Sequence, residues 1–452
     1  MATIARQAVL FQDLFHKPVA VTFAAQALST DGGLLLLKAR DRQLGLTAAM
    51  ARELRDRRQA GKVQHALLEQ LRQRLYAVAC GYPDVNEAAA LANDPIFKLA
   101  CDRGLQAPAL SSQPTLSRFE NAPRRSDLYR LQAALLDTLL KQLHRRHRRA
   151  RRIWIDVDPT CTPTYGGQQL TFFNGFYDTY CYLPLVMTVA FDEDPRKYPV
   201  LILLRPGNAD ALQGVLPLLT RLVPRLRSAW PQARLRLRAD SAYARSELFN
   251  WLEEQRIGYD IAMAANRVLN REVEEALPVV RDLAQRQNET TAFFFQFAYQ
   301  AGTWRQPRRL LAKVEVVVTP GKEPRDNLRY VVTTDPGTPQ HGFTRYYGHS
   351  DMENTLKDLK EGAALGRFGC SSALANQWRA VLSLAAFTLV QGLAPAYRQG
   401  LRPQVATLRA WLLKVAVRVS ESARRIVVEL AEGYPWATRF RQQALRLGAV
   451  PL

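Results

Sequence analysis

The sequence predicts an α/β protein with a helical region before its core and a β-rich insertion within it. Three observations predict this class. Apolar residues recur at helical spacing up to about residue 140, strands and helices alternate from residue 153, and strand-like runs dominate residues 266–345. Because 452 residues are too many for one ordinary core, we expect several domains.

The chain is strongly basic. Its 62 Lys and Arg against 41 Asp and Glu leave a net charge of +21, which favours a polyanion such as DNA as partner. The longest apolar run, Val381 to Val390, is too short to span a membrane, and the N-terminus lacks the apolar region of a signal peptide. The five cysteines have neither zinc-ribbon nor disulfide-framework spacing. We therefore expect a cytoplasmic protein with no membrane partner.

Residues 1–145 are predicted to form a helical N-terminal DNA-binding domain, because runs such as HALLEQLRQRLYAVACGY carry apolar residues three and four apart. Within it, SSQPTLSRFEN begins with a Ser/Pro helix start. It presents Thr115, Ser117, Arg118 and Asn121, a set suited to reading base edges. A short packing helix with ordinary polar residues is the alternative.

A basic run follows at residues 141–152, KQLHRRHRRARR, with seven Lys and Arg. Such runs are commonly solvated helix faces. This one directly precedes an acidic strand, so we expect Arg148 and Arg149 to contact DNA phosphate.

Residues 146–265 and 346–400 are predicted to form the α/β core. Its strands are IWIDVDP, QLTFFNGFY, LPLVMTVAFD, YPVLILLRP, ARLRLRAD and YDIAMAA, and its helices ALQGVLPLLTRLV and SAYARSELFNWLEEQ. Residues 266–345, with TAFFFQFAYQ, RRLLAKVEVVVTP and NLRYVVTT, are expected to be an inserted β-rich subdomain. Residues 401–452 are expected to be a helical C-terminal region.

Two carboxylates stand on one face of the strand IWIDVDPT. Asp156 and Asp158 alternate with apolar residues, and buried acid without a partner is costly. Asp240 lies where a later strand ends and a helix begins, the place where open α/β sheets hold ligands. As alternatives, Asp240 could pair with Arg236 and Arg238, or cap the following helix.

Glu353, in YYGHSDMENTLKDLKEG, is the third candidate acid. It could serve a capping box with Ser350. It also borders an apolar helical stripe, and Tyr346, His349 and Lys360 fall on one line with it if the helix extends backwards. Carboxylates from two strands and a helix could hold two hard divalent cations, Mg²⁺ or Mn²⁺, which would activate water and stabilise the leaving oxygen of a phosphodiester.

The order of these elements resembles the DDE transposases of bacterial insertion sequences. Tyr346, His349, Glu353 and Lys360 match that family's Y-x2-R-x3-E-x6-K signature, except that histidine replaces arginine. GYPDVNEAAALANDPIFK, RADSAYA and LRAWLLKVAVRVSESARRIVVEL are similar to the branch grouped with piggyBac-like elements.

The resemblance implies an RNase-H-like core with Asp158, Asp240 and Glu353 as catalytic, metal-holding acids. Family members usually follow the first Asp closely with Thr or Ser, which favours Asp158, in DPT, over Asp156. Asp156 would then be an auxiliary metal ligand or would support one.

The resemblance also implies DNA contacts. Tyr346 and Lys360 would bind phosphate near the cut, and Trp304, in GTWRQPRR, would stack on a flipped base unless it only packs. His349 would stand at the DNA-contacting arginine position. Because neutral imidazole cannot make the bidentate phosphate contact of arginine, Arg345 could compensate for it.

The implied activity is Mg²⁺-dependent cut-and-paste transposition. The enzyme would cut double-stranded DNA at terminal inverted repeats and join the freed 3′-hydroxyl to target DNA, as a homodimer that pairs two ends at the nucleoid. A catalytically inactive DNA-binding relative is one alternative, against which the intact carboxylates count. A general RNase-H-like nuclease is another, which would not need the N-terminal helices.

Overall fold

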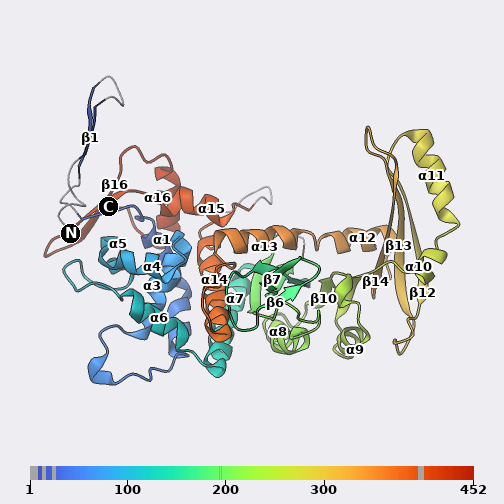
Figure 1. Ribbon diagram of the computed structural model, residues 1–452, viewed down its shortest axis with the longest axis horizontal. Helices are drawn as coiled ribbons and strands as arrows, with labels where there is room; N and C mark the ends of the chain where they lie inside the picture. Colours follow the sequence, from blue (N-terminus) through green and yellow to red (C-terminus); the bar gives the residue numbers. More distant parts are fainter. Residues whose placement is uncertain are drawn as a thin grey trace.

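The computed structural model describes residues 9–12, 17–22, 27–192, 194, 196–394 and 402–451. An eight-stranded mixed sheet, in the order β12-β13-β14-β11-β10-β4-β8-β9, extends from the middle of the molecule to one end (Figure 1). Helices gather at the other end. Within the described residues, no helix is long and apolar enough to cross a membrane.

Five strands form the part of the sheet that carries the acidic residues. They are β4 (Arg152–Pro159), β8 (Leu185–Phe191), β9 (Tyr198–Leu203), β10 (Arg234–Ala239) and β11 (Gly258–Met263). β4 pairs in parallel with β10 and antiparallel with β8, and β10 pairs in parallel with β11. Helix α8 (Val215–Ala229) precedes β10, and α9 (Ser246–Glu254) supplies the crossover that the parallel strands β10 and β11 require. The predicted alternation of strands and helices is confirmed here.

The segment QLTFFNGFY was expected among these core strands, and that expectation was wrong. Its strand β6 (Phe172–Asn174) belongs to a separate three-stranded sheet with β5 (Thr162–Pro163) and β7 (Thr179–Tyr182). Both edges of β4 are already paired, with β8 and β10, so no place remains for it there.

The segment 266–345 lengthens the large sheet. After α10 (Arg267–Arg271) and α11 (Ala276–Gln287), the strands β12 (Thr291–Tyr299), β13 (Arg308–Val317) and β14 (Arg325–Thr333) form an antiparallel meander. β14 pairs with β11, so the β-rich insertion is hydrogen-bonded to the core. α11 packs against β12 and β13.

The expected N-terminal helices are present. They are α1 (Leu34–Leu44), α2 (Leu46–Arg52), α3 (Leu67–Cys80), α4 (Val85–Ala90), α5 (Pro95–Ala100), α6 (Gln113–Asn121) and α7 (Arg125–Arg146). They share one hydrophobic core with α14 (Ala373–Gln391), which packs against both α3 and β9. α14 therefore joins the helical region to the sheet.

The chain ends contain strands that were not expected. Residues 401–452 were predicted to be helical, yet between α15 (Val405–Leu408) and α16 (Ala437–Arg446) lie β15 (Val417–Glu421) and β16 (Ile426–Leu430). β15 also pairs with β3 (Leu28–Ser29), which brings the two ends of the chain together (Figure 1). A two-stranded sheet of β1 (Val9–Phe11) and β2 (Val19–Val21) precedes them. The β-branched valines of β1 and β2 favour strand over helix.

Candidate active site

Asp158 and Asp240 lie side by side at one edge of the sheet. The parallel register of β4 and β10 sets Asp156 opposite Arg238, so Asp158 and Asp240 come next, at the carboxyl ends of the two strands. Both carboxylates are half-buried. This edge is where α/β sheets expose ligand-binding groups.

Glu353 reaches this edge from α13 (Asp351–Gly362). Two contacts tie α13 to the sheet: Thr188 on β8 donates to Sδ of buried Met352 at 3.5 Å, and Lys360 Nζ donates to the Cys161 carbonyl at 2.7 Å. Ser350 makes no side-chain capping hydrogen bond, so the capping-box alternative for Glu353 is not realised. The glutamate is exposed.

The three acids influence one another electrostatically. Burial raises the pKa of Asp158 to about 7, the nearby imidazole of His349 opposes this rise, and the charges of Asp240 and Glu353 add to it. In the described part of the chain, no Lys, Arg or His forms an ion pair with any of the three. Their negative charge is therefore not balanced by the protein.

The three side chains do not form a ready-made metal cage. Among the described residues, no three or more His, Cys, Asp or Glu side chains are grouped so that they could hold one metal ion. Carboxylate oxygens are nevertheless the donors that hard divalent cations prefer, and an uncompensated acidic group is electrostatically suited to them. The donor chemistry fits Mg²⁺ or Mn²⁺, whereas the side chains would have to draw closer to share ions.

Asp156 has a different environment. It is fully buried and accepts hydrogen bonds from Arg238 Nε at 2.7 Å and Lys197 Nζ at 2.8 Å, and His349 Nδ1 lies 3.1 Å from its Oδ1. Burial alone would raise the pKa of Asp156, but Arg238, His349 and Lys197 hold it well below its usual range. Since both oxygens are engaged, the predicted role of Asp156 as an auxiliary metal ligand does not fit. Protein cations balance this charge, and Lys197 was not predicted as a partner of Asp156 from the sequence.

The alternatives for Asp240 have opposite outcomes. Pairing with the neighbouring arginines is wrong, because Arg236 binds Asp260 at 2.8 Å and Arg238 binds Asp156. Capping is confirmed for the short 3₁₀ helix Ser241–Tyr243 that precedes α9, since the Asp240 carboxylate accepts from the Ala242 backbone N–H at 2.9 Å.

The polar line through Tyr346, His349, Glu353 and Lys360 is interrupted. α12 (Pro339–Tyr347) ends before a turn at residues 348–350, so no single helix carries all four. Tyr346 still lies near the acids, because burial, followed by the charge of Asp240, raises its pKa to about 12.

Arg345 does not stand in for the missing arginine. Its guanidinium lies 3.5 Å from Asp260 and 3.4 Å from Asp335. Arg238 is instead the guanidinium that shares Asp156 with His349. Arg238 precedes Asp240 by two residues, just as Asp156 precedes Asp158. Parallel pairing of the two strands therefore places Arg238 beside Asp156, and this matched spacing could have identified the ion pair from the sequence.

Trp304 lies in the core. It is 5% exposed, packs edge-on against Phe249 and Tyr299, and has the Arg308 guanidinium 5.1 Å from its ring centre. Because the ring is covered, the prediction that it stacks on a flipped base does not fit, and the packing alternative does.

The other predicted DNA contacts are exposed. Arg118 lies on α6, whose opposite face buries Leu116 and Phe119, and it donates to Thr115 Oγ1 at 3.3 Å. Arg148 and Arg149 lie in the turn after α7. No contact here tests their role, which stays a prediction.

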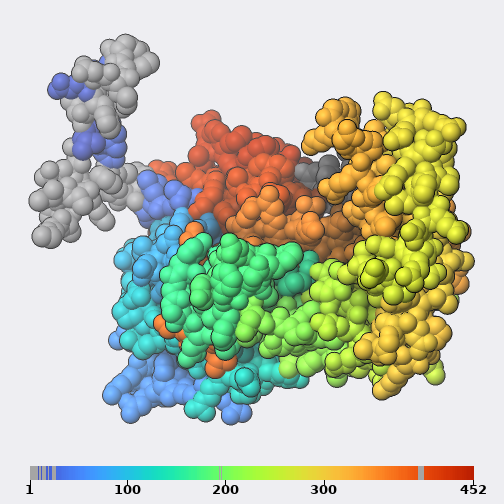
Figure 2. All heavy atoms as spheres, turned by 45° about the vertical axis from the view of Figure 1, so that its right-hand side comes forward, coloured from blue at the N-terminus to red at the C-terminus, as the bar shows by residue number. Residues whose placement is uncertain are grey.

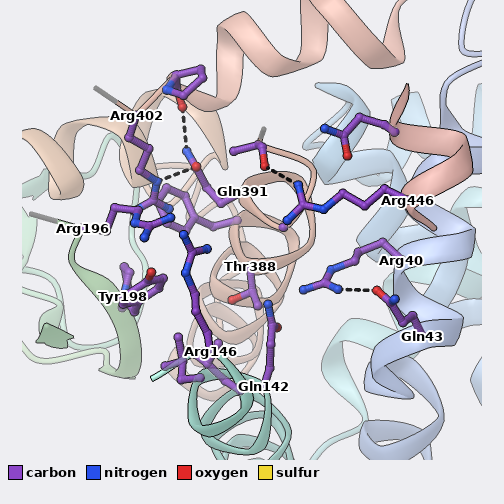
Figure 3. A pocket seen from close by; sticks show the side chains of 18 of the residues that line it. Arg40, Gln43, Gln142, Arg146, Arg196, Tyr198, Thr388, Gln391, Arg402 and Arg446 are labelled. Atoms are coloured by element: carbon purple, nitrogen blue, oxygen red, sulfur yellow. Dashed lines mark hydrogen bonds between the residues drawn. The ribbon is translucent and has the colours of Figure 1, made fainter. Parts of the chain in front are cut away.

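A basic cavity of about 590 Å³ lies apart from the acids. Five arginines from several elements converge on it (Figure 3): Arg40, Arg146, Arg196, Arg402 and Arg446. Burial lowers the pKa of both Arg40 and Arg402 to about 10. None of the three candidate acids lines this cavity. One contact links it to the acidic region: Arg402 donates to the carbonyl of Lys197 at 2.8 Å, and the Lys197 side chain binds Asp156. The cavity was not anticipated from the sequence, because its arginines are scattered along the chain.

Comparison with known proteins identifies the family of the chain. The family model described as transposase DDE domain group 1 matches residues 11–451. A search of curated proteins found none that matches the chain. Because the matched region is nearly the whole sequence, this chain belongs to the DDE transposase domain family, group 1.

Proposed function

We propose that this transposase cuts DNA strands by metal-dependent phosphodiester hydrolysis and joins the freed 3′-hydroxyl to target DNA, the chemistry of cut-and-paste transposition. The observation that carries the proposal is the uncompensated acidic group of Asp158, Asp240 and Glu353 at the carboxyl edge of β4 and β10.

The sheet order supports an RNase-H-like core. Strands β9, β8, β4, β10 and β11 are adjacent in that order, with β4, β10 and β11 parallel, and α8 and α9 lie between later strands in the sequence. The site falls at the carboxyl ends of the parallel strands, where such folds bind ligands.

Asp158, Asp240 and Glu353 would hold two Mg²⁺ or Mn²⁺ ions. When bound, such ions lower the pKa of water and stabilise the leaving oxygen of a phosphodiester. The proposal requires Glu353, on the first turn of α13, to approach the two aspartates when the site fills. Strand β4 must also stay fixed. The ion pairs of Asp156 with Lys197 and Arg238, two residues before Asp158, favour this.

The substrate we infer is double-stranded DNA, both transposon ends and target. Lys360 and Tyr346 border the acids and would contact the phosphates beside the cut, while Arg118, Arg148 and Arg149 would bind DNA farther away. Engagement of two ends implies a synapsed homodimer. The Y-x2-H-x3-E-x6-K residues support an insertion-sequence transposase of the branch grouped with piggyBac-like elements, acting in the bacterial cytoplasm at the nucleoid.

A cleavage assay tests the proposal. A plasmid carrying the DNA that flanks the gene, including any inverted repeats, is incubated with the protein and Mg²⁺. We expect cuts at the repeat ends with the wild type and with Asp351→Asn, an exposed acid on the same turn as Glu353. We expect none with Asp158→Asn, Asp240→Asn or Glu353→Gln.

Two results would count against it. Cleavage retained by Asp240→Asn would remove that residue from the site. Specific binding of the ends without cleavage by the wild type would favour a catalytically inactive DNA-binding protein.

A further inference from the structure

A patch of exposed aromatic side chains stands on the hairpin formed by β6 and β7. We call residues 172–180 the aromatic hairpin. Phe176 is 87% exposed, Tyr180 59% and Phe173 49%, and Phe172 and Tyr177 are also exposed. Soluble proteins seldom expose so many large apolar side chains together, and such patches mark interaction sites.

The aromatic hairpin is held firmly. The Asn174 side chain accepts from the backbone N–H groups of Phe176 and Tyr177 at 3.0 and 3.2 Å, and donates to the Gly207 carbonyl at 2.7 Å. A Cβ at Gly207 would lie 2.3 Å from the carbonyl oxygens of both strands, so only glycine permits this close approach. The rings therefore project from a fixed turn rather than from a loose loop.

The aromatic rings also support each other. Phe173 and Tyr180 form a cross-strand pair with ring centres 5.6 Å apart, and Phe176 and Tyr177 form an edge-to-face pair at 4.8 Å. These contacts leave broad ring surface open to solvent, because all five aromatic residues are more than two-fifths exposed, the least exposed being Tyr177 at 41%.

The aromatic hairpin adjoins the acidic edge of the large sheet. β4 carries Asp158 and ends at Pro159, and β5, which pairs with β7, begins at Thr162. Burial raises the pKa of Tyr177, and the charges of Cys161, Asp158 and Asp240 add to that rise, so its phenol is within electrostatic reach of both acids. In Figure 2 this green segment stands forward on the surface between the blue N-terminal helices and the lighter green core.

The amino-acid composition of the aromatic hairpin indicates which part of a DNA strand it could bind. No Lys, Arg or His occurs from residue 161 to residue 195, and Asp178 is the hairpin's one charged residue. The hairpin therefore offers nothing that attracts a phosphate backbone. Nucleobases, by contrast, present flat faces that stack on aromatic rings whatever their sequence.

We propose that the aromatic hairpin stacks on unpaired nucleobases of the DNA strand that enters the Asp158–Asp240 site. This inference rests on the proposed function, which places the reacting strand beside Asp158 and Asp240. A strand whose phosphate lies at the acids carries its neighbouring bases past Tyr177 and Phe176. Stacking there would hold the strand end apart from its complement.

Binding measurements on the full chain in EDTA test this without any cleavage. The probes are a fully paired DNA duplex and the same duplex with a short unpaired end that carries 2-aminopurine. We expect the wild type to bind the unpaired end more tightly and to quench its fluorescence. Phe176→Ala should weaken binding of that probe roughly ten-fold, the usual effect of losing one stacked base, and leave the paired duplex unchanged.

Matched variants complete the test. Phe176→Trp should keep the preference, as should Phe293→Ala, which removes an exposed ring from β12 in the insertion. The measurements use neither metal nor cleavage, so the preference for the unpaired end should be seen even if the proposed chemistry fails, and the two failures are distinguishable. Equal weakening of both probes by Phe176→Ala would overturn the inference. So would altered self-association of Phe176→Ala without DNA in sedimentation, because the patch would then join copies of the chain.

Discussion

Asp156 and Asp158 stand two residues apart on β4, yet only Asp156 has ion-pair partners among the described residues. Lys197 Nζ lies 2.8 Å from its Oδ2, whereas no Lys, Arg or His pairs with Asp158. The pKa of Asp156 is held well below its usual range and that of Asp158 is raised to about 7. One carboxylate stabilises the strand, and the other is left without an ion-pair partner and is available to a ligand.

The raised pKa of Asp158 predicts a pH-dependent stability without metal. The folded state holds this proton up to about pH 7, whereas the unfolded chain releases it near the ordinary aspartate pKa of 3.8, so the free energy of unfolding should fall as the pH rises between these values. Urea titrations in EDTA at several pH values measure this. Asp158→Asn should reduce the slope. An unchanged slope in that variant would show that Asp158 is not the group responsible.

Buried Asp156 should be important for stability. Asp156→Ala leaves Arg238 and Lys197 without their partner inside the protein, and breaking such a pair typically lowers the free energy of unfolding by about 3–5 kcal/mol. Asp137→Ala is the control, because its pair with Arg225 is exposed and should contribute about 0–1 kcal/mol. Equal effects in urea denaturation would contradict the role given to Asp156.

The acidic site was largely predictable because its signals are local. Asp158 and Asp240 are marked by strand alternation and by a strand end, and parallel pairing of those strands then brings them together. Glu353 needed the spacing of a family signature as well. The helix that should have continued through His349 instead breaks there, and the turn places the imidazole against Asp156.

The features that were missed depend on distant partners. Lys197 follows a loop and carries no local sign that it will meet Asp156. Trp304 is buried by Phe249, a residue of α9, so its own neighbours in sequence could not reveal its burial. The valine-rich strands β15 and β16 were predicted to be helical, because the pairing of β15 with β3 joins residues from opposite ends of the chain and leaves no local sign.

Lys360 should contribute one phosphate contact. Replacing it with Met removes a cation beside the acids, so DNA affinity should fall and the slope of log K against log salt should become shallower by about one. Lys357→Met, an exposed lysine on the same helix, is the matched control. Affinity measured over a salt series tests this. If only the control changes the slope, DNA passes along the other side of α13.

Divalent cations should stabilise the folded chain through the acidic site. A ligand that binds only the folded state raises the free energy of unfolding, by about 2.7 kcal/mol at a hundred times its dissociation constant. Thermal unfolding with and without Mn²⁺ should therefore show a rise in midpoint for the wild type and for Asp351→Asn. The rise should shrink in Asp158→Asn and in Glu353→Gln, because each removes a charge from the group. A full rise in Glu353→Gln would mean that the two aspartates hold the cation without α13, and that Glu353 acts on the DNA rather than on the metal.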